Sequence, residues 1–404
     1  MQGPAMQLRI SGVAVGGDGL AREPSGRVVF VEGGLPGERV AAELVAERRD
    51  HARAVAVDVL DASPSRVVPP CPFVAAGCGG CGWQHVAPGA QVALKAEVVA
   101  DALRRLGGVA DPVVEAGPPL PAAGARTTLR GVADGEGRFA LRRRRSHDLV
   151  PVPGCLVAHP LVAEVLREGA FPPGAEVTVR AGAATGERLV VVDGPGGAPV
   201  DAGDVAVPAG VRVVTGAELA AGRRAWLHEE VAGVRFRVSA RSFFQSGPAA
   251  AGALVDAVAA AAGVGEGDRF ADLYGGVGLF TATVGRRARV QLVEASASAV
   301  ADARVNLRGL DARVVRSDVA RWHPRRTDVV VADPPRAGLG RAGARVVAAT
   351  GARRVVLVSC DAGALGRDVR LLAEAGYEPV ASTLVDAFPH TPHVEVVTRF
   401  DWRR

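Results

Sequence analysis

The sequence predicts a multidomain α/β protein with three consecutive regions: a β-barrel over residues 1–63, an α+β domain over 64–240, and a doubly wound, Rossmann-like domain over 241–404. Three observations lead to this prediction. The chain has 404 residues, which at roughly 100–200 residues per domain suits two or three domains. Short alternating apolar runs fill the N-terminal region. Apolar strands separated by helix-sized gaps recur from residue 248 onward.

The composition is that of a folded protein of the cytoplasm. Hydrophobic residues make up 48% of the chain, which excludes a largely disordered protein. No segment approaches the about 20 apolar residues that span a bilayer, and no basic-then-apolar leader opens the chain, so we expect a cytoplasmic protein without a membrane partner. The net charge of +5 permits a nucleic-acid partner without establishing one, because the first 70 residues carry eight arginines against nine carboxylates.

Residues 7–61 predict the barrel. Alternating apolar runs such as 28–30 and 52–60 are separated by the turn sequences at 16–19 and 35–38, which are rich in glycine and proline. A unit of about 55 residues is the size of a five-stranded barrel, an architecture that often binds oligonucleotides. Any other small β-domain is the alternative.

The middle region, residues 64–240, begins with a loop-like stretch that holds three of the five cysteines. Residues 91–106 have helical periodicity and end at two glycines. β-type runs broken by glycine and proline follow, the clearest being Val177–Val179, Leu189–Val192, Val211–Val214 and Val231–Val238. The basic run Arg142–Arg145 is interpreted as either a solvated face or a phosphate contact.

Four cysteines of this region form one candidate metal site. Cys71, Cys78 and Cys81 are spaced C-x6-C-x2-C, and Cys155 follows in a Pro-Gly-Cys sequence. Four thiolates can hold a 4Fe-4S cluster or a zinc ion. The tight trio with one remote cysteine, and with proline beside two of the four, favours the cluster, which we expect to fix the fold. Zinc and unligated thiols are the alternatives.

The C-terminal region, residues 241–404, shows the βαβ rhythm of a doubly wound parallel sheet. A helical stretch over 249–262 leads into a short apolar strand over 269–274. Further strand-like runs, each separated by room for a helix, lie at Val290–Val293, Val314–Arg316, Val329–Ala332 and Val355–Val358. Ligands of such sheets bind outside the carboxyl ends of the strands, so residues at those ends are the candidates for chemistry.

The first strand of this region runs into the glycine turn Gly275–Gly278, which lets the backbone approach a ligand closely. Glu294 and Asp318 stand at the next two strand ends, and an acid at the second strand end can accept the ribose hydroxyls of an adenosine cofactor. These residues predict a nucleoside cofactor, either a nicotinamide or adenosylmethionine. A plain tight turn with surface carboxylates is the alternative.

Three later strand ends carry groups suited to chemistry. The Asp333–Arg336 loop contains two prolines, which suit a stiff wall against a planar base. Cys360 ends the next strand and lies outside the other cysteine set, so we interpret it as a nucleophile rather than an inert core thiol. Glu395 in the apolar final strand is costly unless used or paired, which makes it a candidate base or a salt-bridged carboxylate. His390 and His393 are interpreted as ordinary loop residues.

In this order and combination, the motifs resemble those of the RNA uracil-C5 methyltransferases, which make 5-methyluridine, over nearly the whole chain. The N-terminal unit looks like a TRAM domain, an RNA-binding barrel. The segment 242–245, Ser-Phe-Phe-Gln, is similar to one whose glutamine contacts S-adenosyl-L-methionine. The resemblance implies a set of cofactor contacts: Gln245, Tyr274, Glu294, Asp318 and Asp333. It also implies catalytic roles for Cys360 as nucleophile and Glu395 as base, and a 4Fe-4S site made by Cys71, Cys78, Cys81 and Cys155.

The resemblance thus implies an S-adenosyl-L-methionine-dependent RNA methyltransferase. Among members of the family, a TRAM domain together with the cluster resembles the branch that modifies 23S rRNA, so we expect rRNA as the partner and a monomeric enzyme. A tRNA uracil-C5 methyltransferase is one alternative. An NAD-dependent iron–sulfur oxidoreductase is another, but it leaves the Asp333–Arg336 loop, Cys360 and the barrel unexplained. A non-catalytic RNA-binding factor is the last, and the presence of Cys360 and Glu395 argues against it.

The sequence departs from the family pattern at two places. Gly275 and Leu279 stand in the glycine turn where a cysteine and an asparagine are common, so we expect one polar cofactor contact to be missing. Asp361 and Ala362 follow the nucleophile where Asn-Pro is usual, so we expect the loop after Cys360 to differ in shape. Neither departure removes a catalytic group.

Overall fold

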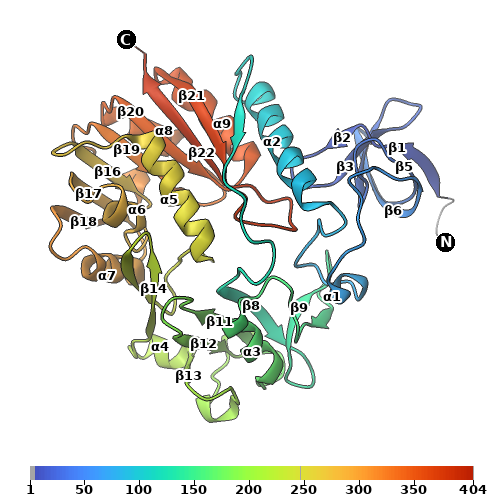
Figure 1. Ribbon diagram of the computed structural model, residues 1–404, viewed down its shortest axis with the longest axis horizontal. Coiled ribbons are helices and arrows are strands. Elements are labelled where there is room, and N and C mark those ends of the chain that lie inside the picture. The colour runs from blue at the N-terminus through green and yellow to red at the C-terminus, as the bar shows by residue number, and fades with distance from the viewer. Residues whose placement is uncertain (1–4, 246, 404) are drawn as a thin grey trace.

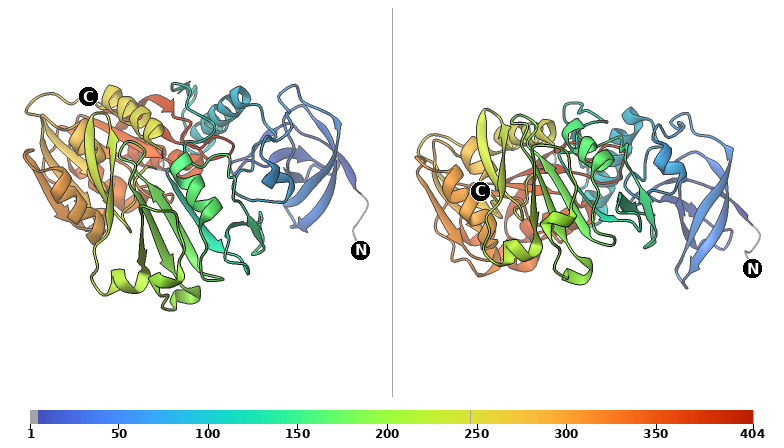
Figure 2. Two further views of the ribbon diagram at one scale, coloured as in Figure 1. Left: turned by 60° about the horizontal axis from the view of Figure 1, so that its bottom comes forward. Right: turned by 90° about the horizontal axis from the view of Figure 1, so that it is seen from below.

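The computed structural model describes residues 5–245 and 247–403 of the chain. Figure 1 shows three parts: a small all-β unit (blue), a β-rich middle part (green), and a large sheet flanked by helices (yellow to red). The all-β unit lies at one end of the molecule, with helix α2 (Pro88–Arg105) between it and the large sheet (Figure 2). None of the helices in these described ranges is both long enough and apolar enough to cross a membrane.

The N-terminal unit is a curved sheet that closes on itself, as the alternating pattern predicts. Its strands are β1 (Met6–Arg9), β2 (Gly12–Val13), β3 (Gly19–Arg22), β4 (Val28–Glu32), β5 (Arg39–Glu47) and β6 (His51–Asp61), in the order β1-β5-β6-β4-β3-β2. β1 also contacts β3, which closes the sheet around a core that includes Leu8, Val29 and Val40. The two-residue strand β2 is additional to the five strands expected, and it pairs only with the start of β3.

The middle part is a mixed sheet with helix α3 packed on it. Its elements are β8 (Thr128–Ala133), β9 (Phe139–Arg142), β10 (Leu149–Pro151), α3 (Pro160–Glu168), β11 (Glu176–Ala181), β12 (Arg188–Asp193), β13 (Val211–Thr215), α4 (Gly216–Ala220), and the 3-10 turns η1 (Pro195–Gly197) and η2 (Ala202–Asp204). The strand order is β10-β9-β8-β11-β12-β13, and only the β12–β13 pair among these strands is parallel. The strands predicted near residues 177, 189 and 211 are confirmed as β11, β12 and β13.

The single strand predicted over Val231–Val238 is wrong, because this run crosses the turn of a β-hairpin. The hairpin consists of β14 (Trp226–Val231) and β15 (Val234–Ser239). Ala232 and Gly233 form its turn with left-handed backbone angles (φ 49° and 72°). Both strands bury apolar side chains in the same core, so the alternation of the sequence continues across the turn.

The C-terminal sheet has the predicted doubly wound pattern, with an antiparallel final strand. Its elements are α5 (Pro248–Ala262), β16 (Arg269–Leu273), α6 (Leu279–Thr283), β17 (Arg289–Glu294), α7 (Ala297–Asn306), β18 (Ala312–Arg316), η3 (Val319–Arg321), β19 (Val329–Ala332), α8 (Gly340–Ala349), β20 (Arg354–Ser359), α9 (Ala362–Glu374), β21 (Tyr377–Leu384) and β22 (Val396–Trp402). The strand order is β18-β17-β16-β19-β20-β22-β21-β7, with β22 antiparallel to both of its neighbours. Helices α5, α6 and α7 cover one face, and α2, α8 and α9 cover the other.

Two elements of the sequence region 64–240 belong in space to this C-terminal sheet. β7 (Val114–Ala116) pairs in parallel with β21 at the edge of the sheet, and α2 packs against α9. The helices are close, since a Cβ added to Gly366 would lie 2.7 Å from the carbonyl oxygen of Ala102. The middle region is therefore discontinuous in space. The sequence did not reveal this because β7 has three residues and α2 has the pattern of an ordinary amphipathic helix.

The middle part and the C-terminal sheet share one hydrophobic core. Leu189 on β12 packs into the same cluster as Phe236 on β15 and Leu254 on α5. Burial of apolar surface from both parts in one cluster holds them together. The change of sheet near residue 240 therefore does not interrupt the core.

Trp83 joins three parts of the molecule. Its indole Nε1 donates to the carbonyl of Gly17 in the barrel (3.0 Å), and its backbone amide donates to the carbonyl of His390 in the loop between β21 and β22 (2.8 Å). The Trp83 side chain is 2% exposed. Gly17 packs so tightly that an added Cβ would lie 2.4 Å from Cβ of Pro392 in that loop. The barrel thus contacts the loop that leads into β22.

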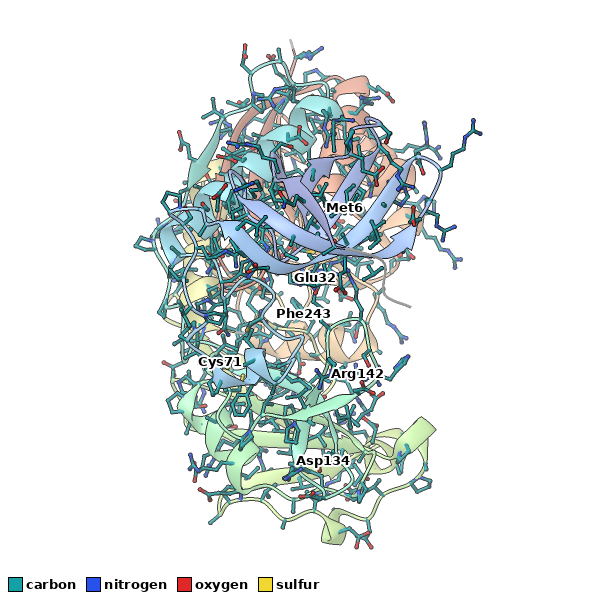
Figure 3. The ribbon with its side chains drawn as sticks, turned by 90° about the vertical axis from the view of Figure 1, so that its right-hand side faces the viewer. Met6, Glu32, Cys71, Asp134, Arg142 and Phe243 are labelled. Carbon is teal, nitrogen blue, oxygen red and sulfur yellow. The ribbon has the colours of Figure 1, made fainter. Side chains whose placement is uncertain are left out.

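Two arginines of the basic run after β9 fasten the barrel to the middle part. Arg144 and Arg145 each form ion pairs with Asp18 and Glu32 of the barrel, with N–O distances from 2.7 to 3.1 Å. These two side chains therefore compensate protein carboxylates, which neither sequence interpretation anticipated. Arg142, labelled in Figure 3, remains exposed.

We predict that Gly17→Ala destabilises the protein by about 1–3 kcal/mol more than Gly16→Ala, the range for overpacking a tight contact. Both glycines have left-handed backbones (φ 91° and 98°), so both variants carry that conformational cost. The new methyl group would meet Pro392 and Trp83 at position 17, whereas nothing described lies within 4 Å of the Cβ position at Gly16. Chemical denaturation measures the difference, and equal stability of the two variants would contradict the contact.

Candidate active site

The structure places Cys360 and Glu395 opposite each other at the carboxyl edge of the C-terminal sheet. Ser359 pairs with Val396 across β20 and β22, so the antiparallel register brings the adjoining residues Cys360 and Glu395 face to face. Glu395 is 3% exposed, whereas Cys360 is partly exposed. A thiol and a buried carboxyl group thus lie together where the ligands of α/β sheets bind.

Cys360 stands between the end of β20 and the start of α9. Asp361 is the N-cap of that helix, and its Oδ1 accepts a hydrogen bond from the Ala364 amide (2.8 Å). Aspartate caps a helix as well as asparagine does, so the departure at Asp361 preserves the helix start. The positive end of the helix dipole also favours a thiolate beside it.

Charged groups around Cys360 shift its ionisation in opposite directions. Burial raises the pKa of the Cys360 thiol, and the carboxyl groups of Glu395 and Asp333 raise that pKa further. The guanidinium of Arg336 lowers it. Arg336 therefore supplies positive charge that favours the thiolate.

A neutral histidine holds Arg336 in place. Nη2 of Arg336 lies 2.9 Å from Nδ1 of His393, and burial together with the charge of Arg336 lowers the pKa of His393 to about 4. An imidazole that is neutral at pH 7 can accept this hydrogen bond at Nδ1. Sequence reasoning treated His393 as an ordinary loop residue and missed this pair. The available signal was the position of Arg336, which lies three residues after Asp333 and therefore close to the predicted site.

Three carboxyl groups gather at this edge of the sheet: Asp272 and Glu395 are buried, and Asp333 is partly exposed. Burial raises the pKa of Asp272 to about 7, and burial followed by the charge of Asp272 raises the pKa of Asp333 to about 7. Burial and the charge of Asp333 raise the pKa of Glu395 well above its usual value. Such a set of carboxyl groups favours a positively charged ligand, because burial without a partner disfavours their ionised forms.

Asp272 has one oxygen that is available to such a ligand. Its Oδ2 accepts hydrogen bonds from the amide and hydroxyl of Thr281 (3.0 and 2.6 Å). Its Oδ1 is buried and has no hydrogen-bond partner among the residues that the structure describes. Sequence reasoning did not select Asp272 as a site residue, although it lies three residues before the glycine turn.

The glycine turn after β16 is held by Glu294 and Asn306. Oε2 of Glu294 accepts a hydrogen bond from the Gly276 amide (3.0 Å), and Nδ2 of Asn306 donates to the Val277 carbonyl (2.9 Å). Tyr274 enters the turn with a left-handed backbone (φ 59°), a strained conformation that is frequent at functional sites. Tyr274 and Glu294, two of the predicted cofactor contacts, therefore meet at one turn.

The two unusual residues of this turn have a packing explanation. A Cβ at Gly275 would lie 2.6 Å from Cγ of Leu292, so the neighbouring strand occupies the space that a cysteine would need. Leu279 is 7% exposed and packs in the hydrophobic core. It therefore offers no polar group to a cofactor.

The other predicted cofactor residues lie on segments that flank this edge. Asp318 follows β18 and accepts a hydrogen bond from the Ala320 amide (2.8 Å). Burial, followed by the charge of Asp318, raises the pKa of Tyr274 to about 12, so the two side chains are neighbours. Gln245 precedes α5 in a segment anchored by Ser242, whose hydroxyl donates to Asp302 (2.6 Å).

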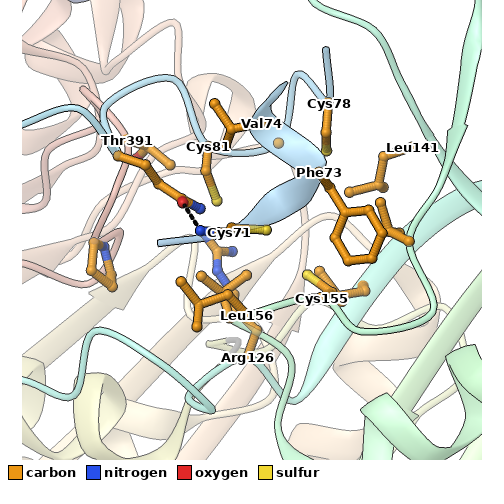
Figure 4. A pocket seen from close by; sticks show the side chains of 16 residues that line it. Cys71, Phe73, Val74, Cys78, Cys81, Arg126, Leu141, Cys155, Leu156 and Thr391 are labelled. Carbon is orange, nitrogen blue, oxygen red and sulfur yellow. Dashed lines mark hydrogen bonds between the residues drawn. The ribbon is translucent and has the colours of Figure 1, made fainter. Parts of the chain in front are cut away.

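The four predicted cysteine ligands line one cavity of about 170 Å³. Cys71 is the N-cap of α1 (Pro72–Ala75), and the chain then turns back so that the Cys78 amide donates to the Phe73 carbonyl (2.8 Å). Cys155 reaches the cavity from the turn between β10 and α3. Figure 4 shows the sulfur atoms pointing into the same space. Among the described residues, no group of three or more His, Cys, Asp or Glu side chains is arranged to hold a metal ion.

Burial disfavours the ionised form of three of these four thiols. Burial raises the pKa of Cys78 and Cys155, and it raises the pKa of Cys81 to about 11. Thiolates in this place need a cation beside them, because burial opposes their ionisation. Pro389 and Thr391, from the loop that leads to Glu395, form part of the cavity wall.

Two family models match the chain. The TRAM domain matches residues 1–57, and the methyltransferase small domain matches residues 249–352. An uncharacterised RNA methyltransferase of Streptomyces avermitilis is 38% identical over 98% of both chains. The 23S rRNA (uracil(1939)-C(5))-methyltransferase RlmD of Alkalilimnicola ehrlichii is 32% identical over 98% of this chain and 96% of its own.

A solved structure shares the fold over nearly the whole chain. The tRNA (uracil-54, C5)-methyltransferase of Pyrococcus abyssi, in complex with S-adenosyl-L-homocysteine, superposes with a TM-score of 0.74. The superposition covers 98% of this chain and 99% of that enzyme, at 23% sequence identity. The two chains thus have the same overall architecture.

We predict that Arg336→Met raises the pKa of Cys360, because it removes positive charge that favours the thiolate. Alkylation of Cys360 by iodoacetamide, followed by peptide mass spectrometry over a pH series, measures this pKa, and the midpoint should move to higher pH. Arg308→Met, which removes an exposed arginine between α7 and β18, is the control and should leave the midpoint unchanged. An unchanged midpoint in Arg336→Met would contradict the charge assignment.

Proposed function

The chain belongs to the RNA methyltransferase family, and we propose that it transfers a methyl group from S-adenosyl-L-methionine to C5 of a uridine in RNA. The observation that carries this proposal is that Cys360 and the buried Glu395 adjoin the paired residues Ser359 and Val396 of β20 and β22. Uracil C5 is a poor nucleophile, and a thiol that adds to the neighbouring C6 splits one difficult step into easier ones. A carboxylate on the opposite strand can then remove the C5 proton.

In the proposed reaction, the Cys360 thiolate bonds to C6 of the uracil, and the displaced electron pair spreads over C5 and O4 as an enolate. C5 then attacks the sulfonium methyl group, and S-adenosyl-L-homocysteine is the leaving group. The Glu395 carboxylate takes the C5 proton, the C5–C6 double bond re-forms, and the C6–S bond breaks to release Cys360. The raised pKa of Glu395, caused by burial and by Asp333, suits a group that takes up a proton.

We propose that the cofactor is bound by the residues Gln245, Tyr274, Glu294, Asp318 and Asp333. Glu294 ends β17, the position from which an acid accepts ribose hydroxyls in sheets of this kind. The sulfonium and ammonium groups of the cofactor are positive, which fits the carboxyl groups of Asp272 and Asp333, whose pKa values are raised in their absence. The nicotinamide alternative loses its basis, because the family model matched over 249–352 is that of a methyltransferase.

We propose 23S rRNA as the substrate, by analogy with the Alkalilimnicola relative. A tRNA uridine is the second candidate, because the Pyrococcus enzyme of the same fold acts on tRNA. The N-terminal unit, matched by the TRAM domain model, would hold the RNA. The target base must leave its stack to reach Cys360, at a cost of a few kcal/mol. Phe243, which is 72% exposed and two residues before Gln245, offers an aromatic face for an RNA base (Figure 3).

We propose that Cys71, Cys78, Cys81 and Cys155 hold a 4Fe-4S cluster. Four cysteine thiolates are the ligand set of such clusters. The four side chains line one cavity of about 170 Å³, which suits a cluster better than a single ion. Such a group would tie the loop around α1 to the turn after β10, and so fix the fold of the middle part.

We predict that protein purified without oxygen contains about four iron and four sulfide ions per chain, the content of one such cluster. Cys155→Ser should lose both and unfold at a lower temperature, because the two segments are no longer joined through the cluster. Iron and acid-labile sulfide analysis with a thermal melt makes the measurement, and Cys360→Ser is the control that keeps its iron. Zinc in place of iron would contradict the cluster.

We predict that Cys360→Ala still binds RNA but forms no covalent complex with RNA that contains 5-fluorouridine. In 5-fluorouridine, fluorine replaces the C5 hydrogen that a base would remove as a proton. Elimination is therefore blocked, and the wild-type protein should stay bonded to C6 after methyl transfer. Denaturing electrophoresis detects this complex. Methyl transfer to ordinary uridine should fall by several orders of magnitude, as expected when a nucleophile is removed. A covalent complex formed by Cys360→Ala would contradict the assignment of the nucleophile.

Glu395→Gln is the matched variant, because it keeps the thiol and removes the base. It should form the 5-fluorouridine complex at the wild-type rate. On ordinary uridine RNA it should accumulate a covalent complex, since the C5 proton has no acceptor. Normal turnover by Glu395→Gln would exclude this residue as the base.

A further inference from the structure

The loop between β21 and β22 carries the proposed base and is held by side chains outside itself. The Val385 amide donates to the Glu395 carbonyl (2.8 Å), which closes the loop at its ends. His390, Thr391 and Glu395 are each 6% exposed or less. In Figure 1 the loop (dark red) runs from the sheet toward the lower end of α2. A buried loop needs partners for its backbone groups, and α2 supplies two of them.

Lys95 on α2 holds the start of this loop. Its ammonium group lies 2.5 Å from Oδ1 of Asp386 and donates to the Phe388 carbonyl (2.9 Å). The side chain is fully buried. Lys95 is the only lysine of the chain, in which arginine is otherwise used in its place. A compact ammonium group with rotatable donors suits this buried position between two oxygens, whereas the planar fork of arginine does not.

Gln91, one turn earlier on α2, holds the middle of the loop. Its Oε1 accepts a hydrogen bond from the His390 amide (2.7 Å), and its Nε2 donates to the Val86 carbonyl (2.8 Å). The His390 carbonyl accepts from the Trp83 amide (2.8 Å). His390 has a left-handed backbone (φ 63°), a conformation that persists where the surroundings impose it. Both backbone groups of the strained residue are therefore held from outside the loop.

The cysteine cavity confines the loop on another side. Pro389 and Thr391 form part of the cavity wall, together with Arg126. The guanidinium carbon of Arg126 lies 5.0 Å from the centre of the Phe388 ring. The segment 386–391 is thus enclosed between α2 and the cavity. Three residues separate Thr391 from Glu395, so we expect a displacement of this segment to reach Glu395.

We propose that Lys95 and Gln91 are positioning residues that place Glu395 for removal of the C5 proton, an inference that rests on the proposed function. Both act through the loop, Lys95 on Asp386 and Phe388 and Gln91 on His390. Cys360 is held separately, by β20 and by the capped start of α9. Changes at Lys95 and Gln91 should therefore slow the removal of the C5 proton and leave the attack of the Cys360 thiol unchanged.

The test compares two RNA substrates. Complex formation with 5-fluorouridine RNA needs thiol attack and methyl transfer but no base, whereas turnover on uridine RNA also needs the base. Lys95→Met should slow turnover by on the order of 100-fold, the effect of a displacement near 1 Å, and should keep the rate of complex formation within about threefold of wild type. On uridine RNA it should accumulate the covalent complex, as expected for Glu395→Gln.

Gln91→Leu is the second variant. It removes the hydrogen bonds to the loop without leaving a buried charge unpaired, so it decides the question if Lys95→Met does not fold, as judged by circular dichroism. The same difference between the two substrates is expected. Arg188→Met breaks an ion pair with Glu164 in the middle part (2.6 Å) and serves as the control, with wild-type rates on both substrates.

The outcomes separate this inference from the proposed function. If a folded Lys95 or Gln91 variant loses both rates equally, the two residues support the fold alone and the inference is overturned. If turnover on uridine RNA is unchanged, Lys95 and Gln91 do not position a group that the reaction needs, and the inference is again overturned. If the wild-type protein forms no complex with 5-fluorouridine RNA, the proposed reaction itself is wrong, and the inference falls with it.

Discussion

The antiparallel pairing of β22 with β20 is the constraint on which the candidate active site depends. Parallel strands of a doubly wound sheet deliver their carboxyl ends to one edge, and only a strand that runs the other way brings its amino end there. Glu395 reaches the edge because β22 begins beside the end of β20, where Cys360 stands. A slip of one residue in this register would turn Glu395 to the other face of the sheet. The pairing of β22 with β21 on its other side holds that register.

This edge is also a place where negative charge is buried at a cost. Burial and the charge of Asp272 raise the pKa of Asp333, and burial and the charge of Asp333 raise the pKa of Glu395. Burial raises the pKa of the Cys360 thiol, and Glu395 and Asp333 raise it further. Arg336, held by a neutral His393, acts in the opposite direction on the thiol. A cationic cofactor bound beside these carboxyl groups would lower their pKa values, so cofactor binding and the release of protons would be thermodynamically linked. Glu395, the proposed base, would then be more readily ionised when the methyl donor is present.

The sequence predicted what local patterns encode. The barrel strands, α5 and the strands of the C-terminal sheet follow from apolar periodicity, and the candidate residues at the strand ends follow from the order of those strands. The features that it did not predict depend on contacts between distant residues. β7 is too short to be recognised before its partner β21 is known, and the Val231–Val238 run hides a turn because both arms bury the same face. The Arg336–His393 bond and the fastening of Arg144 to the barrel likewise join residues that are far apart in the chain.

The contact of Gly17 and Trp83 with the loop before β22 has a consequence for how such proteins can be recombined. A barrel that only tethered RNA could be exchanged between relatives as a cassette on a linker. Here the tip of the barrel forms part of the packing around the loop that carries Glu395, since Gly17 leaves no room beside Pro392. The outer strands can diversify to suit new RNA, but the turn that contains Gly17 must change together with its neighbours Trp83 and Pro392. A transplanted barrel therefore has to match the recipient's loop before β22 as well as the RNA.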